Sequence, residues 1–201
     1  RYEISWTFGT DRFRMIRGGI SLPVFRLGER DDRKVSGLFG PADVRAVPTA
    51  YYALHLREFD MQTHRHPRGE IMYTVSGGCR VTVSGEEHRL RGGQFVLLGP
   101  DVPHRLRIGE DGACSILNLE YAFEGAGPGA SLTKLAQQSG TFRTLYEKGS
   151  GPCLVLVDEG GDGEGRVGRA LQDLIAELEH RERREPYLVE LLFERAMIEI
   201  S

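Results

Sequence analysis

The middle of the chain alternates between short strand-like runs and tight turns. Some runs are apolar and rich in β-branched residues, and others alternate between apolar and polar residues; they cover residues 51–58, 71–75, 80–83, 88–90, 94–98, 104–108 and 113–123. Glycine-containing turns such as Ser76-Gly77-Gly78 separate many of them. Strands that recur at a spacing of about 8–12 residues are typical of antiparallel sandwiches and barrels. The pattern therefore predicts a mainly β fold, in which antiparallel closure removes exposed strand edges.

The periodicity changes near the end of the chain. Apolar residues recur at helical spacing over residues 167–178, which predicts an amphipathic helix. A charged connection follows, and Pro186 suits the first turn of a second helix over residues 188–200. The second helix is apolar over most of its circumference and must therefore bury two surfaces. One surface can meet the first helix, and the other can meet a partner subunit or a missing domain.

The remaining segments give weaker signals. Residues 1–50 are expected to add one or two strands to the sheet. A linker rich in glycine and proline at 124–130 precedes an expected short helix at 131–138, with Ser131 as its N-cap. One more strand is expected at 152–157.

The candidate chemistry begins with two histidines placed two residues apart. On an extended backbone His64 and His66 point the same way, and Glu70 can return to the same pocket after a short bend. His104 is a fourth candidate further along the chain. Three imidazoles and one carboxylate can hold a divalent metal. Zinc is our first expectation, with nickel, iron and manganese as alternatives.

Two residues beside this stretch are candidates for binding an effector. Arg68 and Tyr73 flank the predicted pocket and could orient a ligand, although a solvated arginine and a packed tyrosine are simpler interpretations. His55 and His88 fall in other predicted strands and are not expected to be ligands. Cys79 follows the glycine turn and is interpreted as structural.

Composition narrows the class of protein. The chain has 201 residues, enough for one substantial domain or a domain with an appendage, and its formal net charge is −3. Its arginines are scattered among acidic residues, so this chain is not expected to grip DNA by itself. It shows no apolar run of membrane-span length and no leader peptide, and its three cysteines lack metal spacing. A cytoplasmic protein with free thiols is therefore expected.

The histidine motif resembles the two sequence motifs of the cupin family. The first motif is matched by His64, His66, Glu70 and Gly77, and the second by Gly93, Pro100 and His104. Four loop positions depart from the family pattern, namely Glu58, Gly99, Asp101 and Ile108. The metal-binding side chains are unaffected by these departures. The resemblance implies a double-stranded β-helix, which is a jelly-roll barrel, with a metal at the four ligands.

The two motifs together with the helix pair are similar to the sensor domain of AraC-type transcription regulators. The resemblance implies a cupin effector-binding barrel over residues 1–160, with its core motifs at 59–107, and a helical dimerisation segment over 161–201. The helix-turn-helix domain of such regulators is absent from this chain, so DNA would be contacted only through that domain. No membrane partner is implied.

Two functions remain open at this point. The first is a sensor that binds a small-molecule effector and a divalent metal in the barrel. It would form a homodimer through its last helix, at Leu188, Val189, Leu191 and Leu192. The alternative is a metal-dependent cupin enzyme, such as a dioxygenase, isomerase or decarboxylase, with the same four ligands. No general base is evident beside these ligands, so no catalytic residue is assigned.

Overall fold

The computed structural model describes residues 45–125, 139–147, 153–160, 164–180 and 185–201, together with two-residue strands at 25–26 and 130–131. The strands are β1 (Phe25–Arg26), β2 (Arg45–Leu56), β3 (Phe59–Asp60), β4 (Gly69–Val83), β5 (Glu86–Arg91), β6 (Gln94–Leu98), β7 (His104–Ile108), β8 (Cys114–Glu124), β9 (Ala130–Ser131) and β10 (Cys153–Val157). The helices are α2 (Gly140–Glu147), α3 (Arg166–Glu179) and α4 (Pro186–Ile200). Apart from β1, the first 44 residues and the strands expected there lie outside the described residues.

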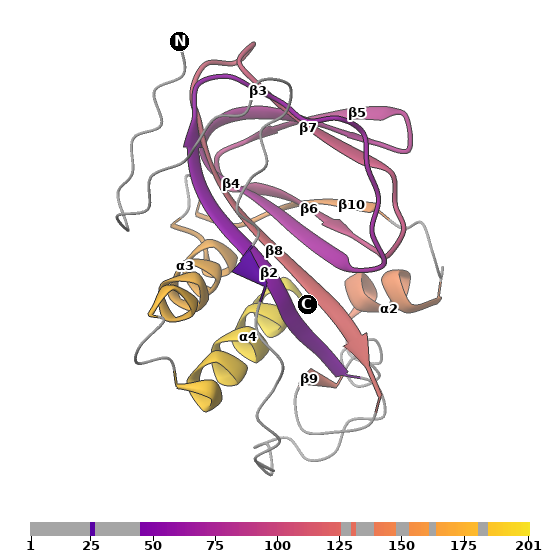
Figure 1. Ribbon diagram of the computed structural model, residues 1–201, viewed down its shortest axis with the longest axis vertical. Coiled ribbons are helices and arrows are strands. Elements are labelled where there is room, and N and C mark those ends of the chain that lie inside the picture. Colours follow the sequence, from indigo (N-terminus) through magenta and orange to yellow (C-terminus); the bar gives the residue numbers. More distant parts are fainter. Residues whose placement is uncertain are drawn as a thin grey trace.

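The strands form two antiparallel layers that share β4. The main layer has the order β1-β2-β8-β4-β6-β10, and the second layer pairs the end of β4 with β5 and β7. Helices α3 and α4 lie together on one side of the strands (Figure 1). The predicted mainly β fold is confirmed. The path through the main layer ends at β1 and β10, so the described strands do not show a closed barrel.

The expected turn at Ser76-Gly77-Gly78 is wrong, because these residues lie inside the long strand β4. The strand bends there instead of reversing, and its pairing register to β8 shifts between Thr74 and Ser76. Gly77 has a φ of 76°, and a side chain on it would collide with the carbonyl of Ala113. A glycine thus lets one strand pass from the first layer to the second.

Two apolar cores lie on the two sides of the main layer. Ile71 and Tyr73 of β4 belong to the outer core, which β4 shares with α3 and α4. Met72 belongs to the inner core, which lies between the two layers of strands. This division follows from the alternation of side chains along a strand. We call the two sides of the sheet its outer face and its inner face.

Helices α3 and α4 cover the outer face. The buried residues of α3 include every apolar position that predicted the helix, namely Val167, Ala170, Leu171, Leu174, Ile175 and Leu178. The Tyr51 hydroxyl donates to the carbonyl of Leu178 at 3.0 Å and so satisfies one group at the helix end. Both predicted C-terminal helices are confirmed. Within the described residues no helix is long and apolar enough to cross a bilayer.

The short helix expected at 131–138 is tested only at its first residue. Ser131 lies in β9, which pairs with β2, and is therefore not an N-cap. Helix α2, which the sequence pattern did not predict, starts at Gly140. Residues 132–138 lie outside the described part of the chain.

Asp158 connects the outer face of the sheet to α3. Its carboxylate accepts hydrogen bonds from the Tyr73 hydroxyl at 2.8 Å, from Gly168 N at 2.8 Å and from Val167 N at 3.3 Å. Its own backbone N–H donates to the Gly93 carbonyl at 2.7 Å. The residue caps α3 from outside the helix and holds the helix start against β4.

Replacing Asp158 by alanine is expected to lower the free energy of unfolding by about 2–4 kcal/mol, because buried N–H and hydroxyl groups lose their acceptor. Urea denaturation of the two proteins measures the change. Asp173→Ala is the matched control, since Asp173 forms an exposed ion pair with Arg195 and its loss costs about 0–1 kcal/mol. Equal destabilisation by both substitutions would show that Asp158 has no special structural role.

Candidate metal centre

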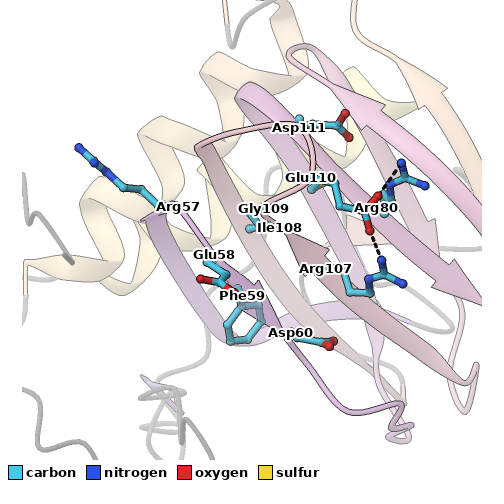
Figure 2. A pocket seen from close by; sticks show the side chains of 12 residues that line it. Arg57, Glu58, Phe59, Asp60, Arg80, Arg107, Ile108, Gly109, Glu110 and Asp111 are labelled. Atoms are coloured by element: carbon cyan, nitrogen blue, oxygen red, sulfur yellow. Dashed lines mark hydrogen bonds and ion pairs between the residues drawn. The ribbon is translucent and has the colours of Figure 1, made fainter. Parts of the chain in front are cut away.

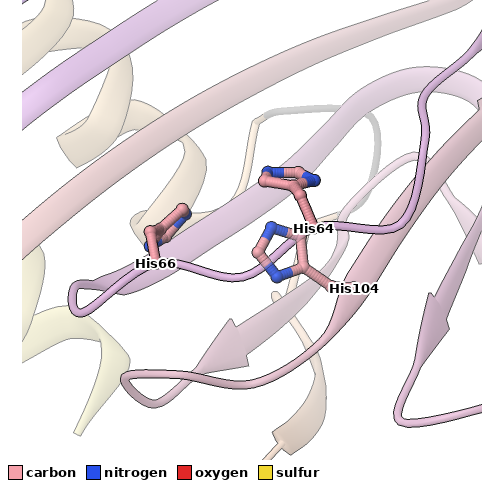
Figure 3. Close-up of side chains that lie close together, drawn as sticks. All are labelled: His64, His66 and His104. Carbon is pink, nitrogen blue, oxygen red and sulfur yellow. The ribbon is translucent and has the colours of Figure 1, made fainter.

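Three histidines converge on the inner face. His64 lies in an extended segment that exchanges two backbone hydrogen bonds with His104 at the start of β7, of 3.0 and 2.9 Å. The ring centroids of His64 and His66 lie 4.2 and 5.2 Å from that of His104 (Figure 3). One nitrogen from each ring lies within 4.8 Å of the others. The structure thus brings together the three histidines that the sequence pattern selected.

Backbone carbonyls orient all three rings. Each histidine bonds through Nδ1 to a carbonyl two residues away: His64 to Gln62 at 3.2 Å, His66 to Arg68 at 3.2 Å and His104 to Val102 at 2.8 Å. A carbonyl can only accept, so each Nδ1 carries its proton and each neutral ring keeps its lone pair on Nε2. This arrangement of a ligating ring with a hydrogen-bonded far nitrogen is typical of metal-bound histidines.

Glu70 lies between two of these rings. Its Oε2 atom is 2.9 Å from His104 Nε2 and 3.1 Å from His66 Nε2. Lone pairs of two imidazoles and a carboxylate repel one another at these distances unless a proton or a metal ion lies between them, and in the absence of metal His66 Nε2 can carry a proton and donate a hydrogen bond to Glu70. His104 Nε2 is buried and its contact with Glu70 does not have hydrogen-bond geometry. The donor set, its orientation and this unsatisfied nitrogen fit a divalent metal, which would supply a Lewis-acidic centre.

The charges of the cluster shift its protonation. Burial opposes ionisation of Glu70, but contacts with His104 and His66 outweigh it and lower its pKa to about 2. The hydrogen bond to Glu70 raises the pKa of His66. Burial favours neutral His104, yet Glu70 raises its pKa above the ordinary value. Burial, together with nearby His104, lowers the pKa of His64. In the metal-free protein, the ionised Glu70 therefore favours protonation of His66 and His104.

The metal-free protein is expected to lose stability as the pH rises above about 6.5, because the raised pKa values of His66 and His104 keep protons on the folded state that the unfolded chain has already released. The lowered pKa of His64 acts in the opposite direction, but only below about pH 6.5. Thermal unfolding of EDTA-treated protein across this range checks the sign. The variant Glu70→Gln should lose most of the dependence. A melting temperature that rises over this range would contradict the assignment.

A second carboxylate, missed in the sequence, lies beside the cluster. Glu120 of β8 is the register partner of Glu70, and its Oε1 atom is 3.9 Å from His66 Nε2. Its Oε2 atom is 2.5 Å from Nε of Arg68, so Arg68 reaches the rim of the cluster. The signal was present in the sequence. Asn118 and Glu120 are polar residues at alternate positions of an otherwise apolar strand.

Tyr73 does not join the cluster, so the structure corrects its placement beside the pocket. It points to the outer face, where it bonds to Asp158 and stacks on Phe95 at a centroid distance of 5.7 Å. The reason is the alternation along β4, which turns Glu70 inward and Tyr73 outward. His55, expected not to be a ligand, bonds instead to the Ser115 hydroxyl at 2.8 Å.

A separate pocket of about 300 Å³ lies beside the second layer of strands (Figure 2). It is lined by β3, by the β4 segment after the Gly77 bend and by the turn at 109–111. None of the three histidines lines it. Glu110 pairs there with both Arg80 and Arg107 (Figure 2), so these charges already satisfy one another. We assign no site to this pocket.

A family model described as a cupin domain (Cupin_2) matches residues 51–120. This stretch contains the whole histidine cluster, Glu70 and Glu120, and it therefore carries a cupin domain. No match was found among curated proteins.

Several solved structures are similar to the chain. The conserved SPY1581 protein from Streptococcus pyogenes, of unknown function, is 17% identical over 39% of this chain and 74% of its own, with a TM-score of 0.34. The cupin domain of an XRE family transcriptional regulator from Enterobacter cloacae is 18% identical over 39% of this chain and 95% of its own, with a TM-score of 0.31. YhaK from Escherichia coli is 15% identical over 54% of this chain and 51% of its own, with a TM-score of 0.38.

Proposed function

We propose that this chain is the ligand-sensing and dimerising part of an AraC-type transcription regulator. Its barrel would hold a divalent metal, zinc in the first instance, and a small-molecule effector. Contact with DNA would belong to a further domain. The observation that carries the proposal is the link through β4, which presents Glu70 to the histidines on one face and Tyr73 to Asp158 and α3 on the other.

This link gives a ligand a physical route to the helices. A ligand that binds at the cluster contacts the inner side of the same strand whose outer side holds the start of α3 through Asp158. It can shift the helices only by the difference between its affinities for two arrangements of them. Couplings between two binding sites are typically about 1–3 kcal/mol.

The exposed side of α4 supports dimerisation. Leu188, Leu191 and Ile198 are 40%, 41% and 49% exposed, which is high for residues so apolar. With Arg195 they follow the alternating spacing of three and four residues that pairs helices in coiled coils. A second copy presents the same stripe, so a two-fold contact between α4 helices would cover both.

The proposed interface differs from the sequence-based one. Val189 lies in the outer core and Leu192 packs against it, because both face α3 and the sheet. Leu188 and Leu191 remain in the proposed interface, and Tyr187 and Ile198 join them as exposed apolar residues of the same helix.

Sedimentation velocity over a range of protein concentrations tests the sensor proposal. We expect a reversible monomer–dimer equilibrium that a bound effector or metal displaces. A protein that stays monomeric at every concentration, with and without metal, would remove the basis for a dimerising sensor.

A metal-dependent enzyme is the second candidate, and one observation favours it. Glu120 provides a carboxylate 3.9 Å from His66 that could move a proton beside a metal-bound substrate. Its ion pair with Arg68 holds it in place. Turnover of small acids, phenols or sugars by the metal-loaded protein, lost in Glu120→Gln, would establish this function instead of the sensor.

A further inference from the structure

A polar patch continues from the histidine cluster along the inner face. Glu120 pairs in register with Glu70, and Asn118 lies two residues before it on the same side of β8. Asn118 in turn pairs in register with Tyr52 of β2. The patch thus runs from Glu70 through Glu120 and Asn118 to Tyr52, within an otherwise apolar inner core.

The end of this patch that includes Asn118 and Tyr52 contains polar atoms without hydrogen-bond partners among the described residues. Tyr52, Asn118 and Glu120 are 8%, 1% and 7% exposed. Among the described residues, neither the Tyr52 hydroxyl nor Asn118 Oδ1 has a hydrogen-bond partner, and neither atom reaches solvent. Buried polar atoms are almost always paired in folded proteins, because leaving them unpaired opposes folding. Phenylalanine and leucine would fill these positions without that cost, so the polar groups are not explained by the fold.

The charges around the patch restrict what could pair with it. A cationic ligand would be repelled by Arg68 and by a divalent ion at the histidines. An anionic ligand would meet the carboxylates of Glu70 and Glu120. A neutral ligand with hydroxyl groups avoids both penalties, since each hydroxyl can donate to one of the unpaired oxygens and accept in turn. The surrounding apolar side chains suit its carbon skeleton.

We propose that Tyr52, Asn118 and Glu120 form a recognition subsite for a small neutral ligand with neighbouring hydroxyl groups, placed beside the histidine cluster. The inference rests on the proposed function in that it names the chemical class of the effector. Arg68 is the entrance to this subsite. The side chain of Arg68 is 24% exposed and that of its ion-pair partner Glu120 is 10% exposed, so Arg68 borders the patch on its more exposed side.

Titration calorimetry on the full chain loaded with zinc tests the subsite. The neutral probes are the vicinal cyclohexanediol, xylitol and catechol. The charged counterparts are aminocyclohexanol and hydroxycyclohexane carboxylate, which keep the first probe's ring. We expect a neutral probe to bind at least about 10-fold more tightly than its charged counterparts. Tighter binding of cyclohexanediol or xylitol would indicate an aliphatic polyol as the ligand, and tighter binding of catechol would indicate an aromatic diol.

The variants separate recognition from folding. Tyr52→Phe and Asn118→Leu should weaken binding by about 10-fold or more, while the melting temperature stays the same or rises, because an unpaired polar group is removed. Tyr121→Phe is the matched control. The Tyr121 hydroxyl is likewise buried without a partner among the described residues, but it lies on the outer face. Its removal should leave probe binding unchanged.

Three outcomes overturn the subsite. They are no binding of any neutral probe, equal binding of a charged counterpart, and unchanged binding by Tyr52→Phe. Sedimentation of the same samples keeps this failure apart from that of the proposed function. A dimer that binds no probe refutes the subsite and leaves the sensor standing, whereas a monomer that binds a neutral probe through Tyr52 supports the subsite and refutes the dimerising sensor.

Discussion

Replacing His64 and His104 together by alanine is expected to abolish stoichiometric metal binding. The two rings are held face to edge at a centroid distance of 4.2 Å by a reciprocal pair of backbone hydrogen bonds, and each offers a ring nitrogen within 4.8 Å of the other. Loss of two of three imidazoles leaves His66 and Glu70, too few ligands for a closed site. Metal affinity should fall by more than the roughly 100-fold that loss of a supporting hydrogen bond to a ligand can cost. Elemental analysis after dialysis measures the bound metal.

The matched control for this experiment is the double variant His55→Ala with His88→Ala. It removes the same two imidazoles from the composition but from other strands, where neither residue belongs to the cluster. This control should retain one metal per chain. Undiminished metal content in the first variant, or equal loss in both, would place the metal elsewhere.

Replacing Leu191 by glutamate is expected to weaken dimerisation by about 100-fold or more. The side chain is 41% exposed at the centre of the apolar stripe on α4, so the change places like charges opposite each other in a two-fold contact. The fold should be unaffected, because the substituted side chain faces away from the outer core. Sedimentation equilibrium gives the dimer dissociation constant, and circular dichroism shows that the helices remain.

Val155→Glu provides the comparison for this prediction. Val155 lies on β10, is 44% exposed and is equally apolar, but it does not lie on α4. Its substitution should leave the dimer intact. If Val155→Glu rather than Leu191→Glu produced monomers, the dimer would form through the sheet edge and not through the helices.

The residues of the candidate metal centre could be selected from the sequence because their geometry is local. His64 and His66 are related by strand alternation, and Glu70 follows them directly. His104 is distant in the sequence and is selected only by the second motif, yet it pairs with His64 in an isolated strand bridge. Local periodicity likewise gave both C-terminal helices correctly.

The neighbours of the site could not be selected in the same way, because they depend on register. Tyr73 is a candidate because it is close in sequence to Glu70, but it lies three residues further along β4, and this odd separation turns it to the other face. Glu120 and Tyr52 reach the patch only through the pairing of β8 with β4 and β2. A single sequence does not state which strands pair, and Asp158 in the loop after β10 gave no sign that it would cap α3.

The central claim is that the three histidines and Glu70 form one metal centre on the inner face of the cupin domain. X-ray absorption spectroscopy of the zinc-loaded protein tests it most directly. We expect a first shell of nitrogen and oxygen at about 2.0–2.2 Å, with outer-shell scattering from three imidazole rings. A shell containing sulfur at about 2.3 Å, or a spectrum without imidazole scattering, would contradict the claim.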